Sequence, residues 1–250
     1  MRFILAATPA ETQAASQHCR TLAHVAYRIG PGSTLLRQNT LRAKGGILSV
    51  SDREAPLIET PEALCAAVVR ECGRQGFSGV LLDFEEPLHQ DRRVFIHTLE
   101  QALSGQKKTL YLPEQYAAKT STAIVLVCTA LSGGSFTQRL REAKAAGCQG
   151  LDVQRLRMEF TLPAPSGEGT PLSGEDLRKL MEREQPTVFF SQDLCARYFT
   201  YARDGRVHFV LFDDAETMNR KVQIGASLGF STAFFMWPEI RDIAGKLNLR

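Results

Sequence analysis

The segment Gly76-Phe77-Ser78-Gly79-Val80-Leu81-Leu82-Asp83-Phe84-Glu85-Glu86-Pro87 has the pattern of a buried β-strand that ends in acidic residues. Alternate side chains on a strand share a face, and one face here is purely apolar: Val80, Leu82 and Phe84. The opposite face begins at Leu81 and ends in two carboxylates, Asp83 and Glu85. An α/β barrel carries its catalytic groups at this end of its strands, which makes both acids candidate catalytic residues. Solvated carboxylates, or carboxylates paired with Lys or Arg, would produce the same pattern.

Apolar runs of strand length recur along the chain, and helical patterns lie between many of them. The expected strands are Phe3–Ala7, Ala23–Ile29, Gly46–Val50, Gly79–Glu85, Thr109–Leu112, Ala123–Thr129, Gly150–Leu156 and Thr232–Trp237. The expected helices are Ala10–Thr21, Pro61–Gln75, Asp91–Ser104, Ser135–Ala146, Gly174–Arg183 and Ala215–Leu228. This alternation predicts an α/β fold, a (β/α)8 TIM barrel that forms a single domain over residues 1–250. No Gly-x-Gly-x-x-Gly follows the first strand, which disfavours an open dinucleotide-binding sheet.

Two segments before the last strand depart from the simple alternation. Tyr198–Tyr201 and Val207–Phe212 flank Asp204-Gly205, a favoured hairpin turn, so we expect a small β-hairpin insertion. The Pro- and Gly-rich stretch Leu162–Pro171 is expected to form a long connection over the barrel mouth.

The composition is that of an ordinary globular protein, with 250 residues, 44% hydrophobic and 23% charged. The net charge of +3 is too small to indicate a nucleic-acid partner. No segment approaches about 18 apolar residues, so we expect no membrane span. The first apolar run, Phe3–Ala7, is too short for a secretory signal peptide, which predicts synthesis in the cytoplasm.

Six cysteines are present without a Cys-x-x-Cys motif, and several lie in apolar runs, such as Cys128. Buried free thiols are therefore expected, although an even number leaves disulfides open. The five histidines show no metal-ligand spacing. We expect neither a metal nor a cofactor.

The acidic strand also resembles the signature of family 18 glycoside hydrolases, the chitinase-like barrels. These enzymes carry Asp-x-x-Asp-x-Asp-x-Glu on their fourth strand. The matching residues here are Ser78, Leu81, Asp83 and Glu85, so the last two acids are kept and the first two are not. The branch of spore-cortex-lytic N-acetylglucosaminidases also relaxes the second Asp and often has Phe before the Glu. This chain, with Phe84, resembles that branch more closely.

The resemblance implies a substrate-assisted retaining hydrolysis of glycans that contain N-acetylglucosamine, such as peptidoglycan, spore cortex or chitin. In the family the Glu protonates the glycosidic oxygen while the substrate's own acetamido oxygen attacks C1. Glu85 would then be the general acid/base, and Asp83 would steer the acetamido group. A proton donor must hold its proton before it reacts, which burial and a neighbouring carboxylate favour. We therefore expect Glu85 to be buried beside Asp83.

A second resemblance lies near the C-terminus, where Asp213-Asp214 is followed by Lys221 and by a last strand that ends at Trp237. In the family this Trp forms the floor of the sugar subsite beside the cleaved bond, and Trp237 is the only Trp of the chain. A core aromatic is the alternative for Trp237. Asp213 and Asp214 are expected at a helix N-terminus rather than in catalysis.

Other polar residues at strand ends are candidates for contact with sugar hydroxyls: Tyr27, Arg28, Ser51, Glu114, Gln154 and Glu239. The family's Met-x-Tyr-Asp motif is missing from Ala123–Thr129 and from Gly150–Leu156, and Tyr27 is one possible replacement for its Tyr. The alternative function is therefore an inactive carbohydrate-binding or spore-coat structural protein on the same barrel. Under either hypothesis we expect a monomer whose partner is a glycan, with spore association left open.

Overall fold

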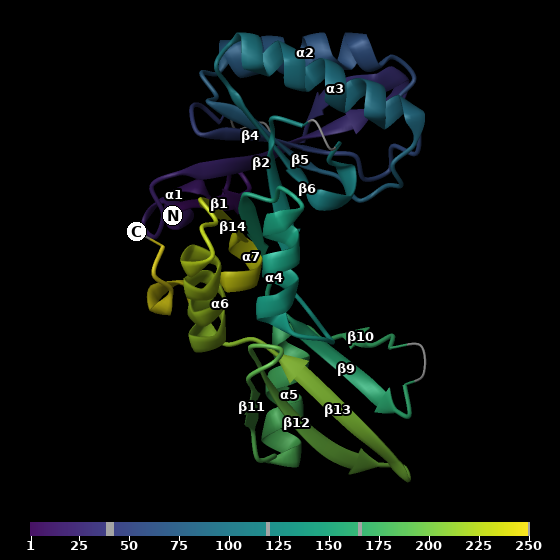
Figure 1. Ribbon diagram of the computed structural model, residues 1–250, viewed down its shortest axis with the longest axis vertical. Helices are drawn as coiled ribbons and strands as arrows, with labels where there is room; N and C mark the ends of the chain where they lie inside the picture. Colours follow the sequence, from purple (N-terminus) through teal and green to yellow (C-terminus); the bar gives the residue numbers. More distant parts are fainter. Residues whose placement is uncertain (39–42, 119–120, 165–166, 250) are drawn as a thin grey trace.

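The computed structural model describes residues 1–38, 43–118, 121–164 and 167–249. Within these residues, parallel strands pair in a ring (Figure 1). In ring order they are β1 (Arg2–Ala7), β2 (Leu22–Gly30), β4 (Ile47–Ser51), β5 (Gly79–Asp83), β6 (Thr109–Pro113), β7 (Ile124–Cys128), β8 (Gly150–Val153) and β14 (Thr232–Met236). Because β1 pairs with both β14 and β2, the ring is closed. The predicted TIM barrel is confirmed, and every expected strand is present close to its expected bounds.

Helices cover the outside of the ring. They are α1 (Thr12–Ser16), α2 (Pro61–Arg74), α3 (Gln90–Gly105), α4 (Phe136–Ala145), α6 (Ala215–Ser227) and α7 (Trp237–Ile240). In Figure 1, α2 and α3 lie side by side at the top of the molecule, and α4, α6 and α7 lie below the ring. Single 3-10 turns lie at Pro31–Ser33, Glu114–Tyr116 and Ala244–Lys246, and β3 (Thr34–Arg37) pairs antiparallel with the end of β2.

Local sequence explains how β5 is delivered to the ring. Helix α2 begins at Pro61, whose fixed φ suits the first helical position, and it ends before Gly76. Gly76 has φ +70°, a left-handed conformation that glycine adopts without strain. A Cβ on Gly79 would lie 2.4 Å from the carbonyl oxygen of Thr109. Glycine at the start of β5 therefore permits the close approach to β6.

The two faces of β5 pack as the alternation predicts. The outward side chains Val80, Leu82 and Phe84 join a buried cluster with residues of α2 and α3, and the ring of Phe84 stacks on Phe95. The inward side chain of Leu81 belongs to an apolar cluster that fills the ring: Ile4, Ala6, Ala23, Ile47, Leu81, Tyr111, Leu126 and Phe234. Because this cluster fills the ring interior, inward polar groups face solvent only at the ends of the strands.

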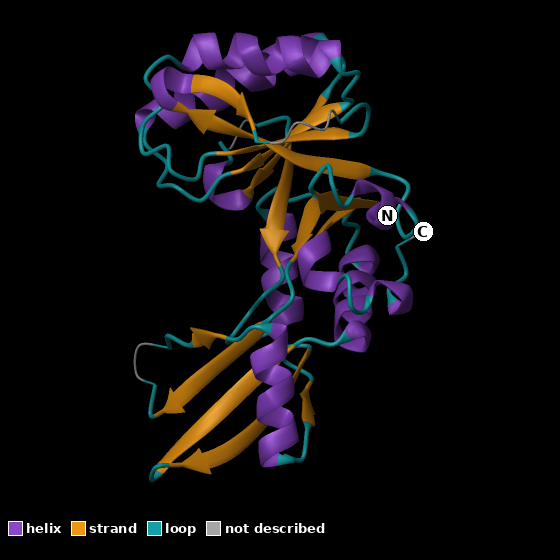
Figure 2. Ribbon diagram, turned by 180° about the vertical axis from the view of Figure 1, so that it is seen from behind, coloured by secondary structure: helices purple, strands orange, loops and turns teal. Residues whose placement is uncertain are grey.

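Residues 157–212, between β8 and α6, form an insertion that is larger than a hairpin. Its elements are β9 (Arg157–Leu162), β10 (Thr170–Pro171), α5 (Gly174–Glu184), β11 (Phe189–Ser191), β12 (Ala196–Arg203) and β13 (Arg206–Phe212). The strands form one antiparallel sheet in the order β10-β9-β13-β12-β11, with α5 packed along one face (Figure 2). The predicted hairpin is β12 and β13, which turn at Asp204-Gly205 and form the middle of this sheet.

The stretch Leu162–Pro171 connects β9 to β10 inside the insertion. Its described residues lie at the outer edge of the insertion, away from the ring (Figure 1). The prediction that this stretch crosses the barrel mouth is therefore wrong. The reason is that β9 and β10 pair with each other, so the stretch between them only links neighbouring strands.

The cysteines are free, and five of the six are buried while Cys128 is partly exposed. In the part of the chain that the structure describes, no helix has both the length and the apolar character needed to cross a membrane.

Candidate active site

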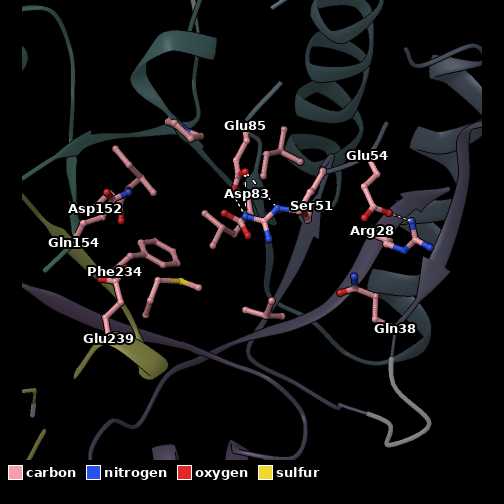
Figure 3. A pocket seen from close by; sticks show the side chains of 17 residues that line it. Arg28, Gln38, Ser51, Glu54, Asp83, Glu85, Asp152, Gln154, Phe234 and Glu239 are labelled. Atoms are coloured by element: carbon pink, nitrogen blue, oxygen red, sulfur yellow. Dashed lines mark hydrogen bonds and ion pairs between the residues drawn. The ribbon is translucent and has the colours of Figure 1, made fainter. Parts of the chain in front are cut away.

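A pocket of about 660 Å³ opens at the carboxyl ends of the ring strands (Figure 3). The residues that line it come from the strand ends and the loops that follow them: Val25, Arg28, Gln38, Ser51, Arg53, Glu54, Leu81, Leu82, Asp83, Glu85, Pro113, Leu126, Asp152, Gln154, Phe234, Met236 and Glu239. Five of these residues are acidic and two are arginines, so the pocket has an excess of carboxyl groups. In the described residues, no group of three or more His, Cys, Asp or Glu side chains is arranged to hold a metal ion.

Asp83 is the last residue of β5, and its side chain points into the pocket (Figure 3). Burial raises the pKa of Asp83, and the nearby carboxylates of Glu85 and Asp52 raise it further, against a lowering effect of Arg53. The part of the chain that the structure describes forms no hydrogen bond to the Asp83 carboxyl group. The group is therefore free to bind a ligand, and it keeps its proton to a higher pH than an exposed Asp.

Glu85 also lines the pocket, but its side chain is 58% exposed. The Arg53 guanidinium lies 3.3–3.4 Å from both Glu85 carboxylate oxygens. The expected burial of Glu85 is therefore wrong. The reason is that β5 ends at Asp83, so Glu85 stands on the loop above the strand, at the rim of the pocket.

Asp152 is an acidic pocket residue that was not among the candidates predicted from the sequence. It faces inward from β8, and the side-chain amide of Gln154 donates a hydrogen bond to it at 2.7 Å. Burial raises the pKa of Asp152 to about 7, and the carboxylates of Glu239 and Asp83 also act in this direction. The sequence signal was available, since Asp152 lies two positions before Gln154, on the same face of an expected strand.

Of the predicted contact residues, Gln154, Arg28, Ser51 and Glu239 line the pocket. Trp237 does not. It is the first residue of α7, it is buried outside the ring, and its ring centroid lies 5.5 Å from that of His18. The apolar surface of the pocket on β14 is formed instead by Phe234 and Met236, which point inward.

Tyr27 and Glu114 also lie outside the pocket lining. A register shift in β2 between Val25 and Tyr27 turns Tyr27 toward α2, where its hydroxyl donates to Glu71 at 2.7 Å. Glu114 follows β6 in a 3-10 turn and forms an ion pair with Arg139 of α4. Both side chains therefore hold the outer layer of helices onto the ring.

No protein-family model and no curated protein matches this sequence. Solved structures do match over most of the chain. A chitinase from Chromobacterium violaceum is 15% identical, with a TM-score of 0.72 over 100% of this chain and 98% of that one. The spore cortex-lytic enzyme SleL of Bacillus megaterium is 15% identical, with a TM-score of 0.68 over 100% of this chain and 75% of that one. The putative sporulation-specific glycosylase ydhD of Bacillus subtilis is 15% identical, with a TM-score of 0.65 and coverage of 84% and 88%. At these identities the comparison shows the fold alone, a (β/α)8 barrel.

Proposed function

We propose that this protein is a glycosidase that hydrolyses glycans containing N-acetylglucosamine, with peptidoglycan or spore cortex as the first substrates to test. The observation that carries the proposal is the position of Asp83 and Glu85. Both carboxyl groups line one pocket at the carboxyl end of the fourth ring strand. Chitinases and spore cortex-lytic enzymes with the same fold support this choice of substrate class.

The proposed reaction is substrate-assisted. Glu85 donates its proton to the glycosidic oxygen, and the bond from that oxygen to C1 breaks. The acetamido oxygen of the same sugar forms a new bond to C1, which gives an oxazolinium intermediate. Asp83 binds the acetamido N–H and stabilises the positive charge that develops on this group. Water then adds to C1 as Glu85 takes back a proton, so the configuration at C1 is retained.

Arg53 has a specific part in this scheme. Its guanidinium pairs with Glu85, and the pair is exposed at the rim of the pocket. A sugar that enters must separate the two groups before Glu85 can reach the glycosidic oxygen. Exposed ion pairs are weak, typically below about 1 kcal/mol, so substrate binding can supply the energy for this separation.

The test compares wild type with Glu85→Gln on a chromogenic chitobioside and on spore-cortex fragments. Glutamine keeps the shape but has no proton to donate, and we expect the rate to fall about 10²–10⁴-fold. Glu175→Gln, on the exposed insertion helix α5, is the matched control and should cleave like wild type. Equal rates for wild type and Glu85→Gln would remove Glu85 as the acid.

One observation favours a second function, a carbohydrate-binding protein without hydrolysis. The Arg53 guanidinium contacts both carboxylate oxygens of Glu85, so in this arrangement neither oxygen is directed at a glycosidic bond. A thiazoline analogue of the oxazolinium intermediate separates the two functions. An enzyme should bind this analogue at least about 10²-fold more tightly than the parent sugar, whereas a passive binder should bind both alike. Calorimetric titration measures both affinities.

A further inference from the structure

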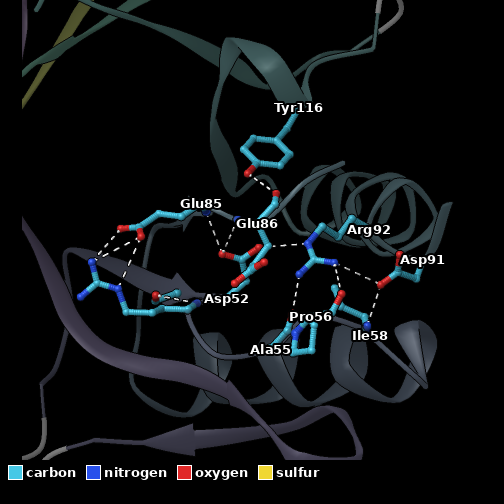
Figure 4. A network of polar contacts seen from close by, with 11 residues as sticks. Asp52, Ala55, Pro56, Ile58, Glu85, Glu86, Asp91, Arg92 and Tyr116 are labelled. Atoms are coloured by element: carbon cyan, nitrogen blue, oxygen red, sulfur yellow. Dashed lines mark hydrogen bonds and ion pairs between the residues drawn. The ribbon is translucent and has the colours of Figure 1, made fainter. Parts of the chain in front are cut away.

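A fully buried ion pair lies directly behind the rim of the pocket. Asp52 follows β4, Arg92 lies in the first turn of α3, and both side chains are 0% exposed. The Nε of Arg92 donates to one carboxylate oxygen of Asp52 at 3.0 Å. Figure 4 shows the pair between the two loops that follow β4 and β5. We refer to Asp52 and Arg92 as the clamp.

The second carboxylate oxygen of Asp52 binds the loop that carries the proposed acid. It accepts hydrogen bonds from the backbone N–H of Glu85 at 2.8 Å and from that of Glu86 at 3.4 Å (Figure 4). The Tyr116 hydroxyl donates to the carbonyl oxygen of Glu86 at 2.6 Å. The backbone around Glu85 is therefore held from two sides, although no sheet ladder reaches it.

The other nitrogens of Arg92 hold the loop after β4. They donate to the carbonyl oxygens of Ala55 and Pro56, and Asp91 adds a further contact. Asp91 also accepts from the N–H of Ile58 at 2.6 Å. One planar guanidinium thus binds the side chain of Asp52 and the turn beyond it, which fixes the direction of the Asp52 carboxylate.

A contribution to stability does not by itself explain why a charged pair occupies this buried position. Removing both charges from water is costly, and apolar residues of the same volume often fill such a position equally well. The clamp is instead placed to control geometry, because residue 52 holds the backbone of Glu85 and residue 53 pairs with its side chain. The loop after β4 therefore contacts both parts of the same residue.

We propose that Asp52 and Arg92 are positioning residues that fix the Glu85 loop, so that the Glu85 carboxyl group is presented at the pocket rim. The inference rests on the proposed function for its catalytic consequence, but its structural part does not. A small displacement of a reacting group, on the order of 1 Å, can cost about 10²-fold in rate. A device that prevents such displacement would explain a charged pair in this buried position.

The first experiment measures amide hydrogen exchange at Glu85 and Glu86, which needs no activity. In Asp52→Asn the side chain cannot accept from Arg92 and from Glu85 with the same orientation, because one side of the amide is a donor. We expect exchange at Glu85 to rise at least about 10-fold in Asp52→Asn. In the double variant Asp52→Asn/Arg92→Met, the amide is free to turn its oxygen to Glu85, so protection should return in part, and the part that does not return measures what Arg92 contributes by holding the loop after β4. Arg93→Met, an exposed neighbour on α3, is the matched control.

The second experiment measures kcat and KM on the chromogenic chitobioside. Asp52→Asn should lower kcat about 10–100-fold with little change in KM, and the double variant should recover a large part of the loss. If Asp52→Asn lowers kcat and also raises KM, and the double variant recovers neither, the pair has only a structural role and the proposal is overturned. Unchanged exchange at Glu85 in a folded Asp52→Asn variant would overturn it as well. If wild type cleaves nothing while exchange behaves as expected, the proposed glycosidase fails and the clamp stands.

Discussion

At the scale of single residues, the pocket is defined by which side chains point inward at the strand ends. Asp83 and Asp152 occupy such positions on β5 and β8, and burial raises the pKa of both. For Asp83 the sequence pattern predicted this position, because the strand is a clear apolar run. The alternation of side chains on a strand also places Asp152 on the inward face of β8, but Asp152 was not predicted, because the sequence around it matches no family signature.

The raised pKa of Asp152 predicts a pH-dependent effect on stability. Its pKa of about 7 in the folded protein exceeds the ordinary Asp value of 3.8, so folding favours the protonated form. This contribution is fully present below about pH 4 and is lost as the pH rises toward 7. Asp152→Asn cannot ionise. We therefore expect it to match wild type in Tm near pH 4 and to exceed it by at least about 2 °C at pH 8.

Thermal unfolding at several pH values measures this difference. Asp204→Asn, on the exposed hairpin turn, is the control and should show no growing difference with pH. A constant Tm difference for Asp152→Asn across the range would contradict the raised pKa.

Phe234 of β14 and Trp237 of α7 should respond differently to truncation. Phe234 lines the pocket but is only 3% exposed and packs edge-on against Tyr111, so Phe234→Ala should weaken binding of an N-acetylglucosamine oligomer by removing part of the pocket floor, and should also lower stability. Trp237 is buried against His18, so Trp237→Ala should cost about 3–5 kcal/mol of stability. Calorimetry and chemical denaturation measure the two effects. Loss of binding in a folded Trp237→Ala, with none in Phe234→Ala, would restore Trp237 to the sugar subsite.

At the scale of elements, the sequence predicted where strands and helices lie far better than which way their last residues point. Helix α2 begins at Pro61 and ends before Gly76 as expected, because the backbone preferences of proline and glycine act locally. Tyr27 turned outward because of a register shift in β2, and Trp237 did so because α7 begins there. Pro238 directly after Trp237 is a local signal for a helix start, whereas the register shift has no local signal. The pairing of β9 with β13 in the insertion is likewise set by contacts far apart in the sequence.

The start of α6 offers a test of two adjacent acids. Asp214 is the N-cap, and it forms a capping box with Thr217, as expected for a helix N-terminal residue. Asp213 is buried, and Lys221 donates to it at 2.7 Å. Asp214→Ala should cost about 1 kcal/mol, the usual value for a lost cap. Asp213→Ala should cost about 3–5 kcal/mol, because it leaves Lys221 buried and unpaired. Urea denaturation compares them, and equal costs would contradict this assignment.

At the scale of the whole molecule, the free cysteines report on the integrity of the closed ring. Burial raises the pKa of every one of them, to about 11 for Cys128, so thiolates are scarce in the folded protein. We expect slow reaction with a thiol reagent in the native state and six reactive thiols after unfolding without reductant. Fewer than six would mean that some cysteines are paired.

The insertion leaves the ring at Arg157 and returns at Phe212, and these two residues are direct partners across β9 and β13. The chain therefore leaves the barrel and returns to it at neighbouring positions, and we refer to the inserted residues 157–212 as the branch. The branch also contacts α4 and α6 through Gln192, Asp193 and Arg197, so changes confined to its outer part would leave the ends of the ring strands where they are. Evolution can thus reshape the outer part of this branch independently of the acids, and a protein engineer could graft a different outer part onto the same base.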